Sequence, residues 1–185
     1  MRKEVVLITG ANGEIGHGLI AHLGQRGDTR ILALDVQPID EALKPYCERF
    51  IQGDILDGML LGRLVVEYEI RTIYHLASIL STKAEYNPET AHRINVEGTL
   101  NLLRLGVEQS QWQGRSVKFM YPSSIATYGL PSLEAKNRFG KVKENEWPRS
   151  DGCGPCSRRC GVVTAAACSQ QTGGEQRGDQ WTQQR

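Results

Sequence analysis

Apolar residues fall into five short runs along the first two thirds of the chain, and the segments between the runs repeat apolar positions at helical spacing. The runs occupy residues 5–9, 31–35, 49–52, 72–77 and 117–122, and they are rich in β-branched and aromatic residues. Runs of about four to eight such residues are typical of strands that are buried on both faces of a sheet. The pattern therefore predicts five buried strands.

Three connecting segments have the apolar spacing of amphipathic helices. The spaced residues are Ile15, Leu19, Ile20 and Leu23 after the first run, Leu60, Leu61, Leu64 and Val65 after the third, and Ile94, Val96, Leu100 and Leu103 after the fourth. The second connection leaves room only for a short helix. In the fourth, Asn87 is a suitable N-cap and Pro88 suits the first turn, so this helix is predicted to run from there towards Gln109.

Strands and helices alternate in this reading of the chain. The order predicts a parallel sheet with right-handed crossovers and helices on both faces, which is a doubly wound α/β domain. We assign residues 1–150 to this domain.

Residues 151–185 have a different composition from the rest of the chain. They contain no Lys, Tyr, His, Leu, Ile or Phe, and we expect a poorly ordered tail because most core-building residue types are missing. Cys153, Cys156, Cys160 and Cys168 supply enough thiolates for zinc or an iron–sulfur cluster in principle. Their spacing matches no metal module, so we predict no metal site and keep metal binding as an alternative.

The charge and hydropathy of the chain narrow the choice of partner. A formal net charge of +1 with no long block of like charges gives no reason to expect nucleic acid or a membrane surface, so a small molecule is the expected partner. The N-terminal apolar run is too short for a signal peptide, and no later run could span a bilayer. The prediction is a cytoplasmic protein.

Three glycines at three-residue spacing lie in the stretch LITGANGEIGHGLI, where the first predicted strand turns into the first predicted helix. At such a junction a pyrophosphate can approach the backbone and meet the positive end of the helix dipole. Gly10 would allow the tight turn, Gly13 the approach of phosphate, and Gly16 close packing of helix on strand. The alternative is a glycine-rich turn without a ligand.

Asp35 ends the second predicted strand, at the distance expected for an acid that binds the adenosine ribose. Its carboxylate could accept hydrogen bonds from both ribose hydroxyls and would repel a 2′-phosphate, which predicts NAD rather than NADP. Arg26 and Arg30 could weaken that preference. A solvated aspartate at the end of a strand is the alternative.

Five motifs in this order resemble the extended short-chain dehydrogenase/reductase family, the NAD-dependent epimerases and dehydratases. GANGEIG is similar to the family's GxxGxxG, and similar segments follow at GDILD (53–57), YHLAS (74–78), NVEGTLNLL (95–103) and PSSIATYG (122–129). The resemblance implies a Rossmann-like domain that binds NAD. The cofactor-binding residues it implies are Gly10, Asn12, Gly13, Glu14, Ile15, Gly16, Asp35, Asp54, Ile55, Leu76, Ala77, Ser78 and Asn95.

Within the family, residues 78–103 are most similar to the short-chain type of L-threonine 3-dehydrogenases. That resemblance implies that Ser81 touches the substrate, although a loop or helix-cap hydroxyl is an equal alternative. Sugar-nucleotide epimerases share the rest of the pattern, so a nucleotide sugar is the alternative substrate. Intact relatives are implied to be homodimers.

The family resemblance also implies a reaction, hydride transfer between the nicotinamide and a carbinol carbon. In that chemistry a Tyr is the general base, a Lys lowers its pKa, and a Ser or Thr hydroxyl orients the substrate. The hydroxyl corresponds to Ser124, for which a turn hydroxyl is the alternative.

The chain departs from the family at the catalytic Tyr and Lys. Relatives carry them as YxxxK on the next helix, but no Tyr follows Tyr128 and no Lys follows Lys143. The change at about Asp151 is what a reading-frame shift or a truncated gene would produce. We therefore expect an NAD-binding half, truncated after about five strands, with an unpaired edge at 117–122 and no turnover by itself. A noncatalytic NAD-binding module or a metal-binding module is the alternative.

Overall fold

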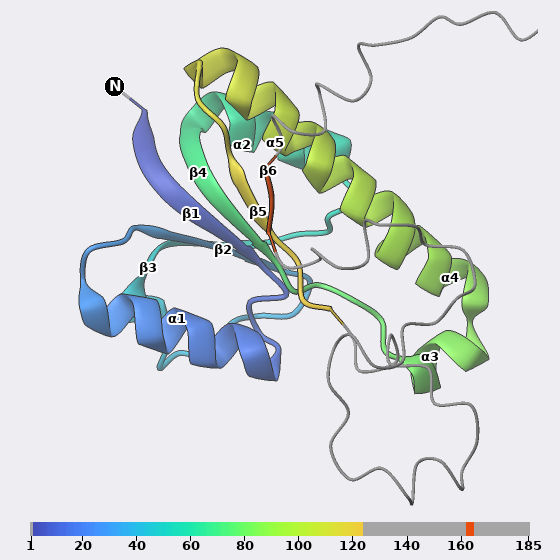
Figure 1. Ribbon diagram of the computed structural model, residues 1–185. Helices are drawn as coiled ribbons and strands as arrows, with labels where there is room; N and C mark the ends of the chain where they lie inside the picture. Colours follow the sequence, from blue (N-terminus) through green and yellow to red (C-terminus); the bar gives the residue numbers. More distant parts are fainter. Residues whose placement is uncertain (1, 124–161, 165–185) are drawn as a thin grey trace, which may run out of the picture.

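The fold is seen in a computed structural model, which describes residues 2–123 and 162–164 of the chain. Its sheet has the order β3-β2-β1-β4-β5-β6, in which the first five strands are parallel and β6 is antiparallel to β5 (Figure 1). The strands are β1 (Lys3–Thr9), β2 (Ile31–Asp35), β3 (Cys47–Gln52), β4 (Tyr68–His75), β5 (Lys118–Met120) and β6 (Val162–Thr164). The five predicted strands and their parallel arrangement are confirmed.

Helices cover both faces of the sheet, as the alternating pattern predicted. α1 lies on one face, and α2 and α5 lie side by side on the other (Figure 1). The helical segments are α1 (Glu14–Arg26), the 3-10 helix η1 (Lys44–Tyr46), α2 (Gly58–Glu67), α3 (Ser81–Tyr86), α4 (Pro88–His92), the π-helical segment η2 (Arg93–Gly98) and α5 (Thr99–Gln113). Asn87 caps α4 by accepting a hydrogen bond of 3.1 Å from the backbone N–H of Thr90.

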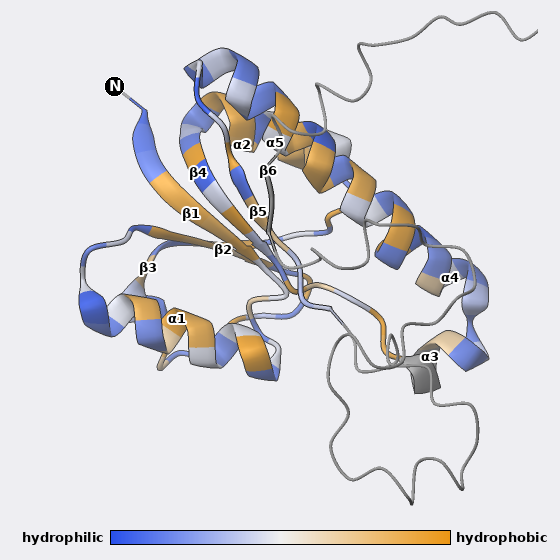
Figure 2. Cartoon of the chain, in the orientation of Figure 1, coloured by the Kyte–Doolittle hydropathy of each residue, from blue (hydrophilic) through white to orange (hydrophobic). Residues whose placement is uncertain are grey.

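The central strands β1 and β2 bury side chains on both faces, which explains why their sequences are continuous apolar runs. In β1 and β2, Leu7 and Leu32 belong to the cluster under α2 and α5, whereas Ile8 and Ile31 belong to the cluster under α1. Figure 2 shows the resulting apolar band along the middle of the sheet.

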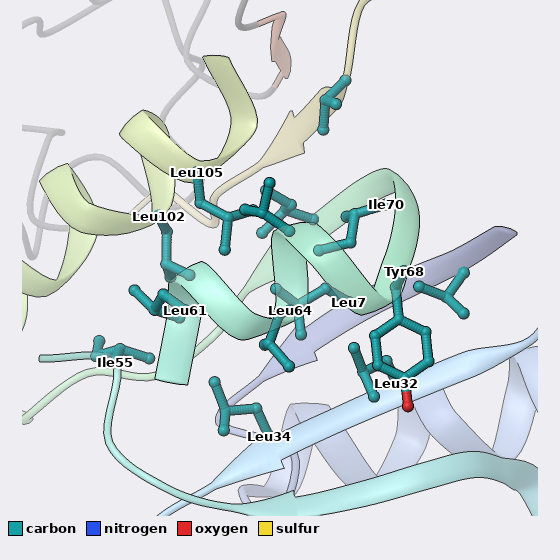
Figure 3. Close-up of a cluster of buried hydrophobic side chains, with 14 of the residues drawn as sticks. Leu7, Leu32, Leu34, Ile55, Leu61, Leu64, Tyr68, Ile70, Leu102 and Leu105 are labelled. Atoms are coloured by element: carbon teal, nitrogen blue, oxygen red, sulfur yellow. The ribbon is translucent and has the colours of Figure 1, made fainter. Parts of the chain in front are cut away.

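The larger cluster joins two helices to the sheet. Leu61 and Leu64 of α2 meet Leu102 and Leu105 of α5 above the strands (Figure 3). Buried beside it is Gln109 of α5, whose amide donates to the carbonyls of Val65 and Tyr68 and accepts from the N–H of Ile70.

The predicted buried face of the fourth helix is partly wrong. Val96 and Leu100 are 43% and 44% exposed, and Leu102 and Leu105 are buried in their place. The buried face passes through Gly98, which packs against Ile55, and continues at helical spacing to Leu102 and Leu105. The apolar spacing of Val96 and Leu100 therefore marked the neighbouring face. Ile15, assigned to the buried face of the first helix, is 65% exposed.

Two further expectations need correction or fall outside the described part of the chain. The edge at β5 is not unpaired, because Phe119 of β5 pairs with Val163 of β6. The predicted boundary at residue 150 lies outside the described residues, as do the four cysteines of the tail. Among residues 2–123, no helix combines the length and the apolar composition needed to cross a bilayer.

Candidate functional site

The strand order places a topological switch point, where open parallel sheets have a ligand crevice, at the carboxyl ends of β1 and β4. The chain leaves β1 towards β2 on one side and leaves β4 towards β5 on the other, so the loops after these neighbouring strands diverge. In open parallel sheets, ligands bind at this switch point. The walls of the crevice are the glycine turn, residues 10–13, and the loop after β4, residues 76–80.

The glycine turn is packed so closely that side chains would not fit at two of its positions. Gly10 has φ +69°, and a Cβ there would lie 2.5 Å from the backbone nitrogen of Ala77. A Cβ on Gly16 would lie 2.4 Å from the carbonyl oxygen of Gly10. Gly10 therefore lets the turn touch the opposite wall, and Gly16 lets α1 pack on the turn.

The N-terminus of α1 has no side-chain cap, unlike the N-termini of α2 and α4. Gly13 is the N-cap and supplies no side-chain hydrogen bond, whereas Asp57 and Asn87 cap α2 and α4 with their side chains. Gly13, Glu14 and Ile15 are exposed at this end. The first-turn N–H groups of α1 are therefore available to an anion, which the helix dipole favours.

Asp35 is already oriented at the end of β2. Its Oδ2 accepts a hydrogen bond of 2.9 Å from the N–H of Asn12, and its Oδ1 accepts one of 2.9 Å from the N–H of Gln37. A carboxylate has about four acceptor positions, so further donors such as ribose hydroxyls can be added. The Asn12 side chain accepts in turn from His17 Nε2 at 2.9 Å. Asp35 thus holds the backbone of the glycine turn, at Asn12, against the end of β2.

The next pair of predicted residues follows β3. Asp54 is half-buried, and its Oδ1 accepts a hydrogen bond of 2.9 Å from the N–H of Leu56. Ile55 is only 4% exposed and packs in the core against Gly98, where a Cβ would lie 2.4 Å from Ile55 Cδ1. The side chain of Ile55 therefore packs in the core, and its carbonyl accepts from Asn101 Nδ2 at 3.3 Å. The carboxylate of Asp54 is the group that is left for a ligand.

The loop after β4 is held from two sides. Leu76 donates its N–H to the carbonyl of Thr9 at 3.1 Å. The Asn95 side chain accepts from the N–H of Ile79 at 2.8 Å and donates to the carbonyl of Ile79 at 2.9 Å. Asn95, predicted to bind the cofactor, therefore contacts this loop directly.

Four more predicted residues lie in or after the loop that follows β4. Ala77 is half-buried beside Gly10, and Ser78 is exposed. Ser81 is the first residue of α3, after the loop. Ser124, the predicted catalytic hydroxyl, lies outside the described residues.

The sequence reading missed a buried histidine beneath the crevice. His75, the last residue of β4, has no exposed surface and hydrogen-bonds Thr9 and Thr99 through its two ring nitrogens. Burial lowers the pKa of His75 from 6.5 to about 4. A histidine inside the apolar run TIYHLA was the available signal, because a buried polar side chain needs partners.

We expect the free energy of unfolding to fall as the pH drops from 6.5 to about 4. In this window the unfolded chain protonates His75 and the folded chain does not, so acid favours the unfolded state. The contribution is fully present above pH 6.5 and is lost by about pH 4, with a size on the order of 3 kcal/mol. Urea denaturation at a series of pH values measures it.

The control for this pH dependence is an exposed histidine. His22→Gln should keep the slope of wild type, since His22 is exposed on α1, whereas His75→Gln should flatten it. Equal slopes in the two variants would show that His75 is not the group responsible.

Comparison with known proteins agrees with this geometry. The model of the NAD dependent epimerase/dehydratase family matches residues 6–150. A curated relative from Homo sapiens, named inactive L-threonine 3-dehydrogenase, mitochondrial, is 33% identical over 129 residues, which is 69% of this chain.

Two solved structures are also similar. A monomeric L-threonine 3-dehydrogenase from a metagenome database, in its apo form, is 35% identical with a TM-score of 0.58 and covers 68% of this chain. The structure of MoeE5 in complex with UDP-glucose and NAD is 27% identical with a TM-score of 0.59 and covers 78%.

These matches span only part of each relative. The matched region is 53% of the human protein, 38% of the metagenomic dehydrogenase and 42% of MoeE5. Residues 6–150, which the family model matches, include both walls of the crevice. From its family-model match, its identity to the human relative and its fold, the chain belongs to the NAD-dependent epimerase/dehydratase family.

Proposed function

We propose that residues 1–150 are the nucleotide-binding half of an NAD-dependent oxidoreductase and bind NAD(H) across the crevice. The observation that carries this proposal is the connection from the uncapped N-terminus of α1, through Asn12, to the carboxylate of Asp35. A pyrophosphate would accept hydrogen bonds from the first turn of α1, and the adenosine ribose would donate to Asp35. The nicotinamide would then extend towards residues 76–79.

The proposed reaction is hydride transfer at a carbinol carbon of a small-molecule substrate. NAD supplies the hydride acceptor when bound, while Ser124 orients the substrate hydroxyl and Ser81 contacts the substrate. L-Threonine is the preferred candidate, since the metagenomic relative is named an L-threonine 3-dehydrogenase and the human one an inactive L-threonine 3-dehydrogenase. A nucleotide sugar is the second candidate, because MoeE5 was solved with UDP-glucose.

Catalysis also requires a general base. This chain has no Tyr and Lys in the YxxxK arrangement that family members carry on the helix after the catalytic hydroxyl. No Tyr follows Tyr128 and no Lys follows Lys143. We therefore propose that the 185-residue chain binds the cofactor without turning over substrate. A cytoplasmic location and homodimer formation remain predictions; the human relative is named mitochondrial and the metagenomic one monomeric.

Titration of NADH fluorescence tests the cofactor site. Asp35→Ala should weaken NADH binding by about tenfold or more, as expected for lost hydrogen bonds to a charged acceptor. Asp40→Ala is the matched control, because Asp40 is exposed and also accepts a backbone N–H at 2.9 Å, from Ala42. Its affinity for NADH should equal that of wild type.

Titration with NADPH separates recognition of the ribose from the shape of the turn. If the Asp35 carboxylate repels a 2′-phosphate, Asp35→Ala should weaken NADH and leave NADPH equal or improved. An equal loss for both cofactors would mean that Asp35 acts only by holding Asn12. Unchanged NADH affinity in Asp35→Ala would refute the proposed site.

A further inference from the structure

A series of hydrogen bonds, buried at Thr9 and His75 and half-buried at its two ends, runs beneath the crevice from one wall to the helix behind it. Thr9 Oγ1 lies 2.8 Å from His75 Nδ1, and His75 Nε2 lies 2.9 Å from Thr99 Oγ1. At one end the N–H of Ala77 donates to Thr9 Oγ1 over 3.5 Å, and at the other Thr99 Oγ1 donates to the carbonyl of Asn95 at 2.7 Å. These hydrogen bonds connect β1, β4, η2 and α5.

The direction of the protons in this chain follows from its last bond. The Thr99 hydroxyl has one proton, which it donates to Asn95, so it accepts from His75 Nε2–H. A neutral ring then has a lone pair on Nδ1, which accepts the hydroxyl proton of Thr9. Thr9 Oγ1 is left to accept from Ala77. When His75 is neutral, each hydroxyl and each ring nitrogen in this series therefore has a hydrogen-bond partner.

The surroundings of His75 favour that neutral form. Phe119 and Tyr121 of the β5 side place their rings 6.0 and 5.3 Å from the imidazole, and Thr9 and Thr99 face its nitrogens. Tyr121 is the one titratable side chain among these four neighbours. Burial in this setting also lowers the pKa of His75 to about 4.

Both ends of this series of hydrogen bonds reach the loop after β4. The hydroxyl of Thr9 accepts from the N–H of Ala77, and its carbonyl accepts from the N–H of Leu76. At the other end, the Asn95 side chain bonds both the N–H and the carbonyl of Ile79. Ala77 is also the residue that Gly10 approaches. The loop that forms one wall of the crevice is therefore attached to the turn that forms the other.

We propose that His75 is a positioning residue for the cofactor: by joining the hydroxyls of Thr9 and Thr99, it fixes the backbone of residues 76–79 against the glycine turn. This role rests on the proposed binding of NAD(H) in the crevice. His75 touches neither the crevice surface nor the cofactor and acts through its two threonines.

Thr99→Val is the most discriminating variant. It preserves the shape of the side chain and removes the partner of His75 Nε2. In the described structure no hydrogen bond joins Thr99 to Ala77, whose N–H donates to Thr9, so an effect at Ala77 would have to pass through His75. Amide exchange measured by NMR without cofactor should become about tenfold faster at Ala77, as for one lost buried hydrogen bond. Thr99→Ser should restore the slow exchange, since it restores the hydroxyl.

Thr72→Val is the matched control. Thr72 is a half-buried residue of β4, and none of the side-chain hydrogen bonds found in the described part of the chain involves it. Its variant should keep the exchange rate at Ala77 and the NADH affinity of wild type. Equal exchange at Ala77 in Thr99→Val and Thr72→Val would overturn the proposal.

NADH titration of the same variants decides whether the loop position matters for binding. The affinity should fall severalfold in Thr99→Val and recover in Thr99→Ser. Faster exchange with unchanged NADH affinity would overturn the positioning role. If wild type binds no NADH, the proposed function fails by itself, and the role of His75 towards the cofactor fails with it.

Discussion

Gly16→Ala is expected to destabilise the protein by about 3 kcal/mol and to abolish measurable NADH binding. The added Cβ would lie 2.4 Å from the carbonyl oxygen of Gly10 and 2.6 Å from that of Ala11. Both contacts are to backbone, so α1 must move away from β1 or the glycine turn must change shape. Either response displaces the N–H groups that would bind the pyrophosphate. Urea denaturation and NADH titration measure the two effects.

Gly18→Ala is the matched control, two residues further along the same helix. A Cβ at Gly18 meets nothing within 4 Å. Alanine has the higher helix propensity, so this variant should be more stable than wild type by roughly 0.5–1 kcal/mol, with unchanged NADH affinity. If Gly16→Ala behaved like Gly18→Ala, the close packing of helix and turn would not be needed for binding.

A chimera is expected to have the largest effect on activity. Residues 1–150 joined to the C-terminal half of a threonine dehydrogenase of the family should oxidise threonine with NAD at about 1 per second or faster. The 185-residue chain should show no turnover, because the general base and its Lys are missing from the family's position. The joined half would supply both, next to a crevice that this chain already forms.

Serine variants of the chimera identify its catalytic hydroxyl. Ser124→Ala should lose nearly all turnover while binding NADH normally, and the neighbouring exposed residue offers the control Ser123→Ala, which should stay active. Turnover of UDP-glucose but not threonine would favour the nucleotide-sugar alternative. Turnover of about 1 per second by the unmodified chain would contradict the assignment of a binding half.

Much of the scaffold was predictable because its signals are local. A strand buried on both faces must be apolar throughout, and the bounds of β2 (Ile31–Asp35) match the predicted run. Asn87 caps its helix as expected, because a capping side chain needs only a backbone N–H three residues away. The three glycines likewise identified the turn, since their role depends on the strand and helix that flank them.

Other features depend on contacts between residues that are distant in the chain. The packing of Gly98 against Ile55 and the pairing of β5 with β6 left no periodic signal in the sequence. His75 meets Thr9 and Thr99, which are 66 and 24 residues away, and Asp35 meets Asn12 across 23. The strands, the cap and the glycine turn could be predicted from the sequence alone, because backbone conformation depends mainly on nearby residues. Tertiary structure decided which polar groups meet around the crevice, because hydrogen-bond partners are chosen by packing.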